Sequence, residues 1–74
     1  MDDAAKQEAK RRFGARLRQL RKARKLSQEK VALIAGMDRS YLGAIERGEN
    51  SVSLVNIHRI AEALEVEPAE LFQS

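Results

Sequence analysis

The sequence predicts an all-α fold, a compact five-helix domain with one small core. Apolar residues recur at spacings of three and four along several segments, and no stretch of strand length alternates apolar and polar residues. A single Pro and four Gly in 74 residues leave these segments almost unbroken. The length suits one domain, residues 1–74, and lies near the lower limit at which a core stabilises itself.

The first predicted helix spans about residues 6–24. A stripe with spacings of four, three and four passes through the apolar residues Phe13, Leu17 and Leu20 and ends at Arg24, while the other faces of the helix are basic. The polar residues 1–8 are expected either to fray or to extend this helix.

Each remaining helix is predicted from the residues that flank it. The predicted ranges are 28–35 between Ser27 and Gly36, 39–47 between Asp38 and Gly48, 54–64 after Ser53, and 68–72 beginning at Pro68.

The charges are unevenly distributed along the chain. Between Lys10 and Lys25 there are nine Lys or Arg and no Asp or Glu, whereas residues 61–74 contain four Glu and no base. A stretch this basic is expected either to bind a polyanion such as nucleic acid or to form a solvated surface.

Composition favours binding over catalysis. The chain has no Cys and one His, which excludes disulfides, thiol catalysis and a His/Cys zinc site. We therefore expect no enzyme activity, no metal, no cofactor and no small-molecule substrate, and we interpret His58 as a boundary residue of its helix. No run of eighteen apolar residues and no signal-peptide pattern occurs, so we expect a cytoplasmic protein with no membrane partner.

The pattern between residues 28 and 45 predicts two helices that cross steeply at a tight turn. Ala32 is small enough for the crossing, and Gly36 tolerates the backbone angles of the turn. Leu42 and Ile45 would anchor the second of these helices, whose first turn then projects outward.

This pattern resembles the helix-turn-helix of the Cro/phage-repressor (XRE) family, which has a lambda-repressor-like fold. The resemblance covers residues 13–72 and includes Arg-Leu-Arg-Gln-Leu-Arg at 16–21, Leu-Ser-Gln-Glu at 26–29 and Ile-Glu-Arg-Gly at 45–48. Within the family, residues 38–43 and 53–57 are most similar to the controller proteins of restriction–modification systems. The resemblance implies a transcriptional regulator, associated with the nucleoid, that binds a two-fold operator in double-stranded DNA as a homodimer.

The resemblance also implies roles for individual residues of the helix-turn-helix, about residues 27–47, and of the loop after it. The base contacts would be made by Arg39, Ser40, Tyr41 and Ala44, the backbone contacts by Gln28, Arg47, Asn50, Ser51 and Ser53, and a structural pair by Arg21 and Glu46. Arg39 is suited to a base contact, because a guanidinium can bind O6 and N7 of guanine together. Tyr41 is equally suited to pack over the helix-turn-helix.

A dimerisation region is expected over about residues 53–74. Its candidate interface residues are Val55, Val66, Leu71 and Phe72, since so short a chain cannot bury them all. Glu29, at the start of the second helix, is a candidate contact to RNA polymerase.

Two departures from the family pattern stand out. Many relatives carry a basic residue after the glycine that ends the recognition helix, whereas this loop reads Glu49-Asn50-Ser51. Leu33 and Ile34 also replace residues that are polar in many relatives, and Leu33 should point outward.

Three other functions remain open. An antitoxin-like protein would bind DNA and also hold a toxin through Leu33, Ile34 or the chain ends. A bridging module would bind proteins and no longer read DNA. A basic helix lying on an anionic membrane is disfavoured, because the core requires the few apolar residues of the first helix.

Overall fold

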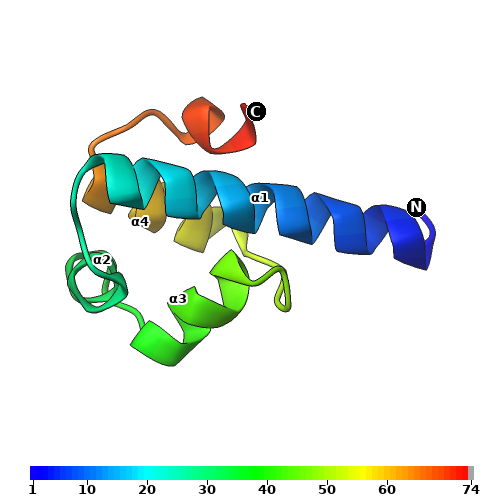
Figure 1. Ribbon diagram of the computed structural model, residues 1–74, viewed down its shortest axis with the longest axis horizontal. Helices are drawn as coiled ribbons and strands as arrows, with labels where there is room; N and C mark the ends of the chain where they lie inside the picture. The colour runs from blue at the N-terminus through cyan, green and yellow to red at the C-terminus, as the bar shows by residue number, and fades with distance from the viewer. Residues whose placement is uncertain (74) are drawn as a thin grey trace.

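Four α-helices and one 3₁₀-helix make up most of the chain, and the computed structural model describes residues 1–73 (Figure 1). Their bounds are α1 Asp3–Ala23, α2 Gln28–Ala35, α3 Arg39–Glu46, α4 Leu54–Leu64 and η1 Pro68–Phe72. The all-α class is confirmed, since residues 1–73 contain no strand, but the predicted fifth α-helix is a 3₁₀-helix. Five residues form too short a segment to gain from α-helical propagation. Ser74, the last residue of the expected dimerisation region, lies outside the described residues.

The helix starts follow from local capping. Ser27 and Ser53 each accept a hydrogen bond from the backbone N–H three residues on, at 3.0 and 3.1 Å, as predicted. Asp38 occupies the N-cap position of α3, but its side chain accepts no capping bond. The helix α1 begins earlier than expected, because Asp2 accepts a hydrogen bond of 2.8 Å from the backbone N–H of Ala5.

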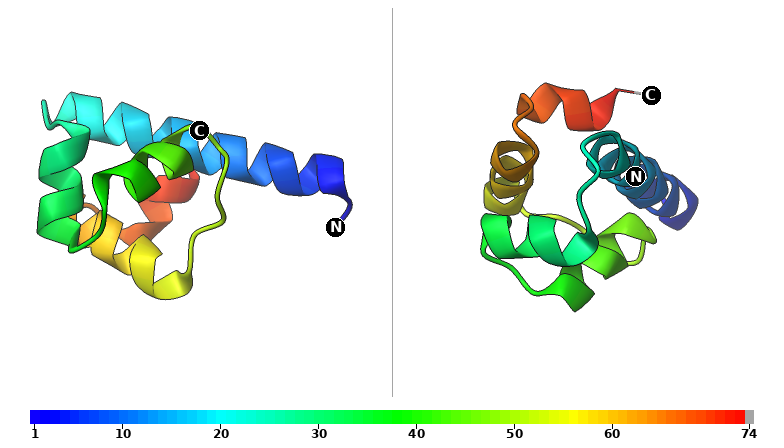
Figure 2. Two further views of the ribbon diagram at one scale, coloured as in Figure 1. Left: turned by 90° about the horizontal axis from the view of Figure 1, so that it is seen from below. Right: turned by 60° about the vertical axis from the view of Figure 1, so that its left-hand side comes forward.

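The long helix α1 crosses the whole molecule (Figures 1 and 2). It packs against α3 on one side and η1 on the other, while α2 packs against α3 and α4. Its 21 residues span about 32 Å at 1.5 Å per residue, close to the longest extent of the molecule, 33 Å. The first turns of α1 therefore protrude beyond the body, as Figure 1 shows. Within residues 1–73, no helix is long and apolar enough to span a bilayer.

The core lies where these helices meet, and it includes one residue that we had expected at a dimer interface. Its fully buried large side chains are Leu17, Val31, Leu42, Ile45, Ile60, Leu64 and Leu71. The prediction for Leu71 is wrong, because η1 packs on α1 and α4 and buries this side chain completely. The next residue, Phe72, is 62% exposed, with its ring centroid 5.4 Å from that of Phe13.

The contact between α1 and the end of α3 depends on Gly14. A Cβ at this position would overlap the carbonyl oxygen of Ile45 and lie 2.6 Å from that of Glu46. Gly14 therefore lets the backbones of the two helices approach more closely than any side chain would allow.

A buried ion pair fixes the same two helices seven residues further along α1. The Arg21 guanidinium donates to both carboxylate oxygens of Glu46, at 2.6 and 3.1 Å, and to the carbonyl of Leu26 at 2.8 Å. The two side chains are only 11% and 3% exposed. The hydrogen bonds to Glu46 raise the pKa of Arg21, so the guanidinium stays charged. The predicted structural pair is present.

Gly14→Ala should destabilise the fold by about 1–3 kcal/mol, because α1 and α3 must separate to accept the methyl group. Helix propensity alone acts in the opposite direction, since Ala is favoured over Gly by about 1 kcal/mol inside a helix. Urea unfolding measures the net effect. A variant as stable as the wild type, or more stable, would contradict the close contact. Ala15→Gly at the neighbouring exposed position is the control and should cost only about the propensity difference.

Glu46→Gln should cost about 3 kcal/mol of unfolding free energy, since it leaves the Arg21 charge buried without its partner. Glu49→Gln is the matched control, because Glu49 pairs with Arg47 at the surface and exposed pairs contribute little. The control should have a nearly unchanged urea midpoint. Equal midpoints for the two variants would show that the buried pair has no special structural role.

Candidate nucleic-acid interface

The first turn of α3 presents two polar side chains to the surface. Arg39 and Ser40 are exposed, whereas Leu42, Gly43, Ala44 and Ile45 of the same helix are buried. The helix is therefore held in the core from Leu42 onward, and its first two side chains face the solvent. A turn held in this way can enter a groove of DNA while the remainder of the helix stays in the fold.

Ala44 does not belong to this exposed set. It is 9% exposed and counts among the buried core residues, so the prediction of a base contact there is wrong. The end of α3 packs against α1 and α2, which leaves the Ala44 methyl group little access to a ligand.

Tyr41 lies half-buried at the edge of the core. Its hydroxyl group donates to the carbonyl of Ser51 and accepts from the Asn56 amide, both at 3.4 Å. The ring therefore joins α3 to the loop after it and to α4. Tyr41 was expected either to contact a base or to pack over the helix-turn-helix, and these contacts correspond to packing.

Gln28 links the start of α2 to the end of α3. Its side-chain amide donates to Glu46 at 3.0 Å, on the same carboxylate oxygen that Arg21 Nη2 contacts. Gln28 Oε1 also lies 3.4 Å from the position that a Cβ of Gly43 would occupy. Gln28 is thus a brace for α3, and it stands at the N-terminal end of α2, where backbone N–H groups point outward.

The loop after α3 carries the other candidate contacts to the DNA backbone. Asn50, Ser51 and Ser53 are exposed. Arg47 is also exposed, but its guanidinium donates to both carboxylate oxygens of Glu49, at 2.8 and 3.2 Å. These hydrogen bonds raise the pKa of Arg47 and lower that of Glu49. The two charges largely cancel, so the loop offers a phosphate polar groups but little net positive charge.

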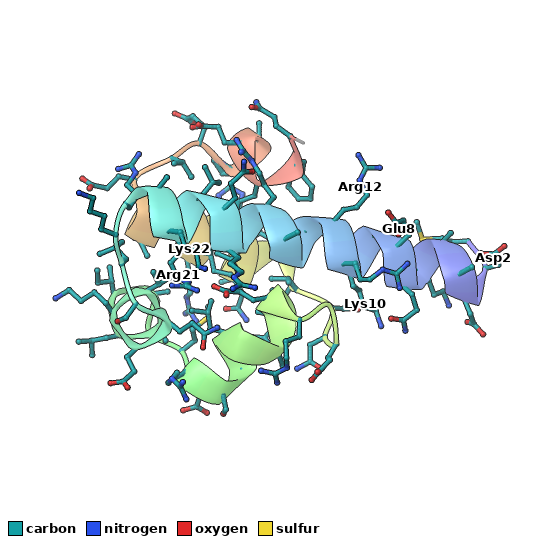
Figure 3. The ribbon with its side chains drawn as sticks, in the orientation of Figure 1. Asp2, Glu8, Lys10, Arg12, Arg21 and Lys22 are labelled. Atoms are coloured by element: carbon teal, nitrogen blue, oxygen red, sulfur yellow. The ribbon has the colours of Figure 1, made fainter. Side chains whose placement is uncertain are left out.

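The basic stretch of α1 serves two purposes. Some of its arginines hold the fold: Arg16 donates to the carbonyl of Glu70 at 2.7 Å, and Arg24 donates to that of Glu65 at 3.1 Å. Arg11 pairs with Glu8 at 2.8 Å. Within residues 1–73, the bases of this stretch that form no ion pair or side-chain hydrogen bond are Lys10, Arg12, Arg18, Lys22 and Lys25. Figure 3 shows Lys10 and Arg12 on opposite sides of α1.

Two exposed apolar regions lie on the other elements. On α4, Leu54 and Val55 line a shallow hollow of about 330 Å³ together with His58, Arg59 and Glu62. On α2, Leu33 is 74% exposed, as expected for an outward-pointing residue, and Ile34 is 53% exposed. Val66 is half-buried against the core and leaves only part of its side chain for a partner.

The chemistry of the described residues does not suggest a metal centre. Among residues 1–73, no three His, Cys, Asp or Glu side chains lie together as metal ligands would. The polar groups at the start of α3 are instead the guanidinium of Arg39 and the hydroxyl group of Ser40. The side-chain amide of Gln28 stands at the start of α2.

Known proteins share this arrangement. Residues 17–71 match the family model described as "Helix-turn-helix". The chain is 45% identical over 60 residues to control protein C.BamHI of Bacillus amyloliquefaciens, a match that covers 80% of this chain and 74% of that protein. It is also 45% identical over 62 residues to control protein C.MunI of a Mycoplasma species, covering 82% of this chain and 84% of that protein.

A solved structure agrees with these matches. The restriction-modification controller protein C.AhdI from Aeromonas hydrophila is 57% identical, with a TM-score of 0.84 over 85% of this chain and 96% of that one. The resemblance to controller proteins that the sequence predicts is thereby confirmed. Because the family model covers most of the chain, this protein belongs to the helix-turn-helix family.

Proposed function

We propose that the protein is a sequence-specific DNA-binding transcriptional regulator of the restriction–modification controller type, which binds a two-fold operator as a homodimer and regulates its own gene. The observation that carries this proposal is the exposed first turn of α3, with Arg39 and Ser40 free and the second half of the helix fixed in the core. The controller proteins among its relatives support it.

In this proposal Arg39 and Ser40 read base edges, and Gln28, Asn50, Ser51 and Ser53 contact the sugar–phosphate backbone. Tyr41 holds the loop that carries Ser51 through the hydrogen bond from its hydroxyl group to the Ser51 carbonyl. Arg47 reaches a phosphate only if its pair with Glu49 opens. Base contacts give specificity, whereas backbone contacts set the position of the protein on the duplex.

One copy of α3 reads too few base pairs to select a site in a genome, so two copies on a two-fold site are required. We place the dimer interface on Val55 and Phe72, which are the candidates that the fold leaves exposed, at 59% and 62%. Leu54, beside Val55, extends the apolar surface.

Two finer roles belong to the same proposal. Glu29 is exposed in the first turn of α2, where a carboxylate can face RNA polymerase. A regulator of this kind acts in the cytoplasm, on the nucleoid.

A second function rests on Leu33 and Ile34. Both side chains are exposed on α2. Leu33 also lines a hollow of about 470 Å³ beside Met37, whose lining includes the charged residues Glu29, Lys30, Asp38 and Arg39. An antitoxin-like protein would use such a surface to hold a partner while α3 binds DNA. Co-purification with a small protein encoded by a neighbouring gene, lost on Leu33→Asp, would favour this function.

Arg39→Ala should weaken binding to the operator by about 1–3 kcal/mol and binding to random duplex much less, because a base contact is lost. The operator is obtained by selection from a randomised duplex pool, and affinities are measured by fluorescence anisotropy. Lys30→Ala removes an exposed charge from α2 and is the control, which should weaken both duplexes alike. If Arg39→Ala also weakens both alike, Arg39 contacts a phosphate. If selection enriches no sequence, the protein is better explained as a bridging module that binds proteins and does not recognise a DNA sequence.

Val55→Asp and Phe72→Asp should each raise the dimer dissociation constant by at least about tenfold, which corresponds to roughly 1.4 kcal/mol. Both side chains are exposed, so the circular dichroism spectrum of each variant should keep its helical signal. Sedimentation equilibrium measures the association. Leu33→Asp, which changes a side chain on α2 that is also exposed, should remain dimeric. Dimers that persist in both aspartate variants would place the interface elsewhere.

A further inference from the structure

The part of α1 between Lys6 and Arg11 lies beside the loop that follows α3. Lys6 and Lys10, one helical turn apart on the same face, line a hollow of about 300 Å³ together with Asn50 and Ser51. The rest of its lining is apolar: Met1, Ala9, Phe13, Val52, Ile57 and Phe72. In Figure 3 the side chain of Lys10 leaves α1 on the side of α3 and its loop, whereas that of Arg12 leaves on the side of η1.

The distance between this part of α1 and the loop is fixed by Gly48. Its φ is +76°, and a Cβ there would lie 2.9 Å from Cγ and 3.0 Å from Cα of Arg11. The loop therefore begins in direct contact with the backbone of α1. Any phosphate that reaches Asn50 and Ser51 comes close to the two lysines.

The charges around the hollow favour an anion. Arg47 is paired with Glu49 and Arg11 with Glu8, so these four charges largely cancel. Among the ion pairs formed by residues 1–73, none involves Lys6 or Lys10. No carboxylate lines the hollow. The charged residues of its lining are Lys6 and Lys10, and the carboxylates of Asp2 and Asp3 lie one helical turn before Lys6, outside the hollow.

We propose that Lys6 and Lys10 bind the sugar–phosphate backbone of duplex DNA next to Asn50 and Ser51, and so supply the positive charge that the loop itself lacks. This inference rests on the proposed function. Both lysines precede residue 17, where the match to the family model begins, so the match assigns them no role. An ammonium group on a flexible stem binds phosphate oxygens without a fixed geometry, which suits contacts that carry no sequence information.

The test uses the salt dependence of binding to a fluorescein-labelled duplex pool of random sequence. Each phosphate contact releases counterions, so its loss lowers the slope of log affinity against log salt by about one unit. Lys10→Gln should lower the slope by about one unit for each protomer bound, and Lys6→Gln combined with Lys10→Gln by about twice as much. Glutamine keeps the helix propensity of lysine nearly unchanged.

Arg12→Gln is the matched control, because it removes one charge from an exposed position on the opposite side of the same helix. It should leave the slope almost unchanged. If Lys10→Gln and Arg12→Gln lower the slope equally, α1 acts only through its long-range field and the proposed contact is wrong.

A coupling measurement gives a second readout. Ser51→Ala and Lys10→Gln should be non-additive if both residues bind the same stretch of backbone, and additive effects would contradict the shared contact. A different result would contradict the proposed function alone: the wild type binds the random pool, but selection enriches no operator. A wild type that binds no duplex at all would overturn both proposals.

Discussion

The contact between α1 and the end of α3 controls the position of every candidate DNA-binding group. Gly14 allows the backbones to touch, and the Glu46 carboxylate accepts hydrogen bonds from Arg21 on α1 and from Gln28 on α2. Three helices thus meet at one buried carboxylate. An apolar contact would supply comparable stability, but the guanidinium and carboxylate impose one orientation. This orientation fixes the direction in which the start of α3 points.

An eight-residue helix has little stability of its own, so α3 depends on this contact for its existence as well as its direction. From Leu42 onward it is buried in the core, whereas Arg39 and Ser40 at its start are exposed. Tyr41 extends the same rigidity to the loop through Ser51 and Asn56. These hydrogen bonds link α3 to the loop that carries Ser51.

Local chemistry predicted the helices well, and long-range packing caused the errors. Ser27, Ser53, Gly36 and Gly48 mark helix ends by properties that each residue carries itself, and the structure agrees. The burial of Ala44 and Leu71 depends instead on how distant segments fold over them, which no spacing pattern encodes. The family resemblance supplied the Arg21–Glu46 pair, although its residues are 25 positions apart. The placement of Lys6 and Lys10 beside the loop was missed, because it depends on the extension of α1 toward Asp2 and on the approach at Gly48.

The arginines and lysines of this protein occupy different structural settings, for a physical reason. The arginines that join α1 to other elements each use more than one nitrogen of the planar guanidinium, as Arg16, Arg21 and Arg24 do. Within residues 1–73, no lysine side chain forms an ion pair or a hydrogen bond to the rest of the fold. A guanidinium fork holds a fixed geometry, whereas an ammonium group is a compact and mobile point charge. The fold thus uses part of its arginine content for internal geometry and leaves its lysines at the surface, where their interaction with a polyanion is set by charge and salt concentration.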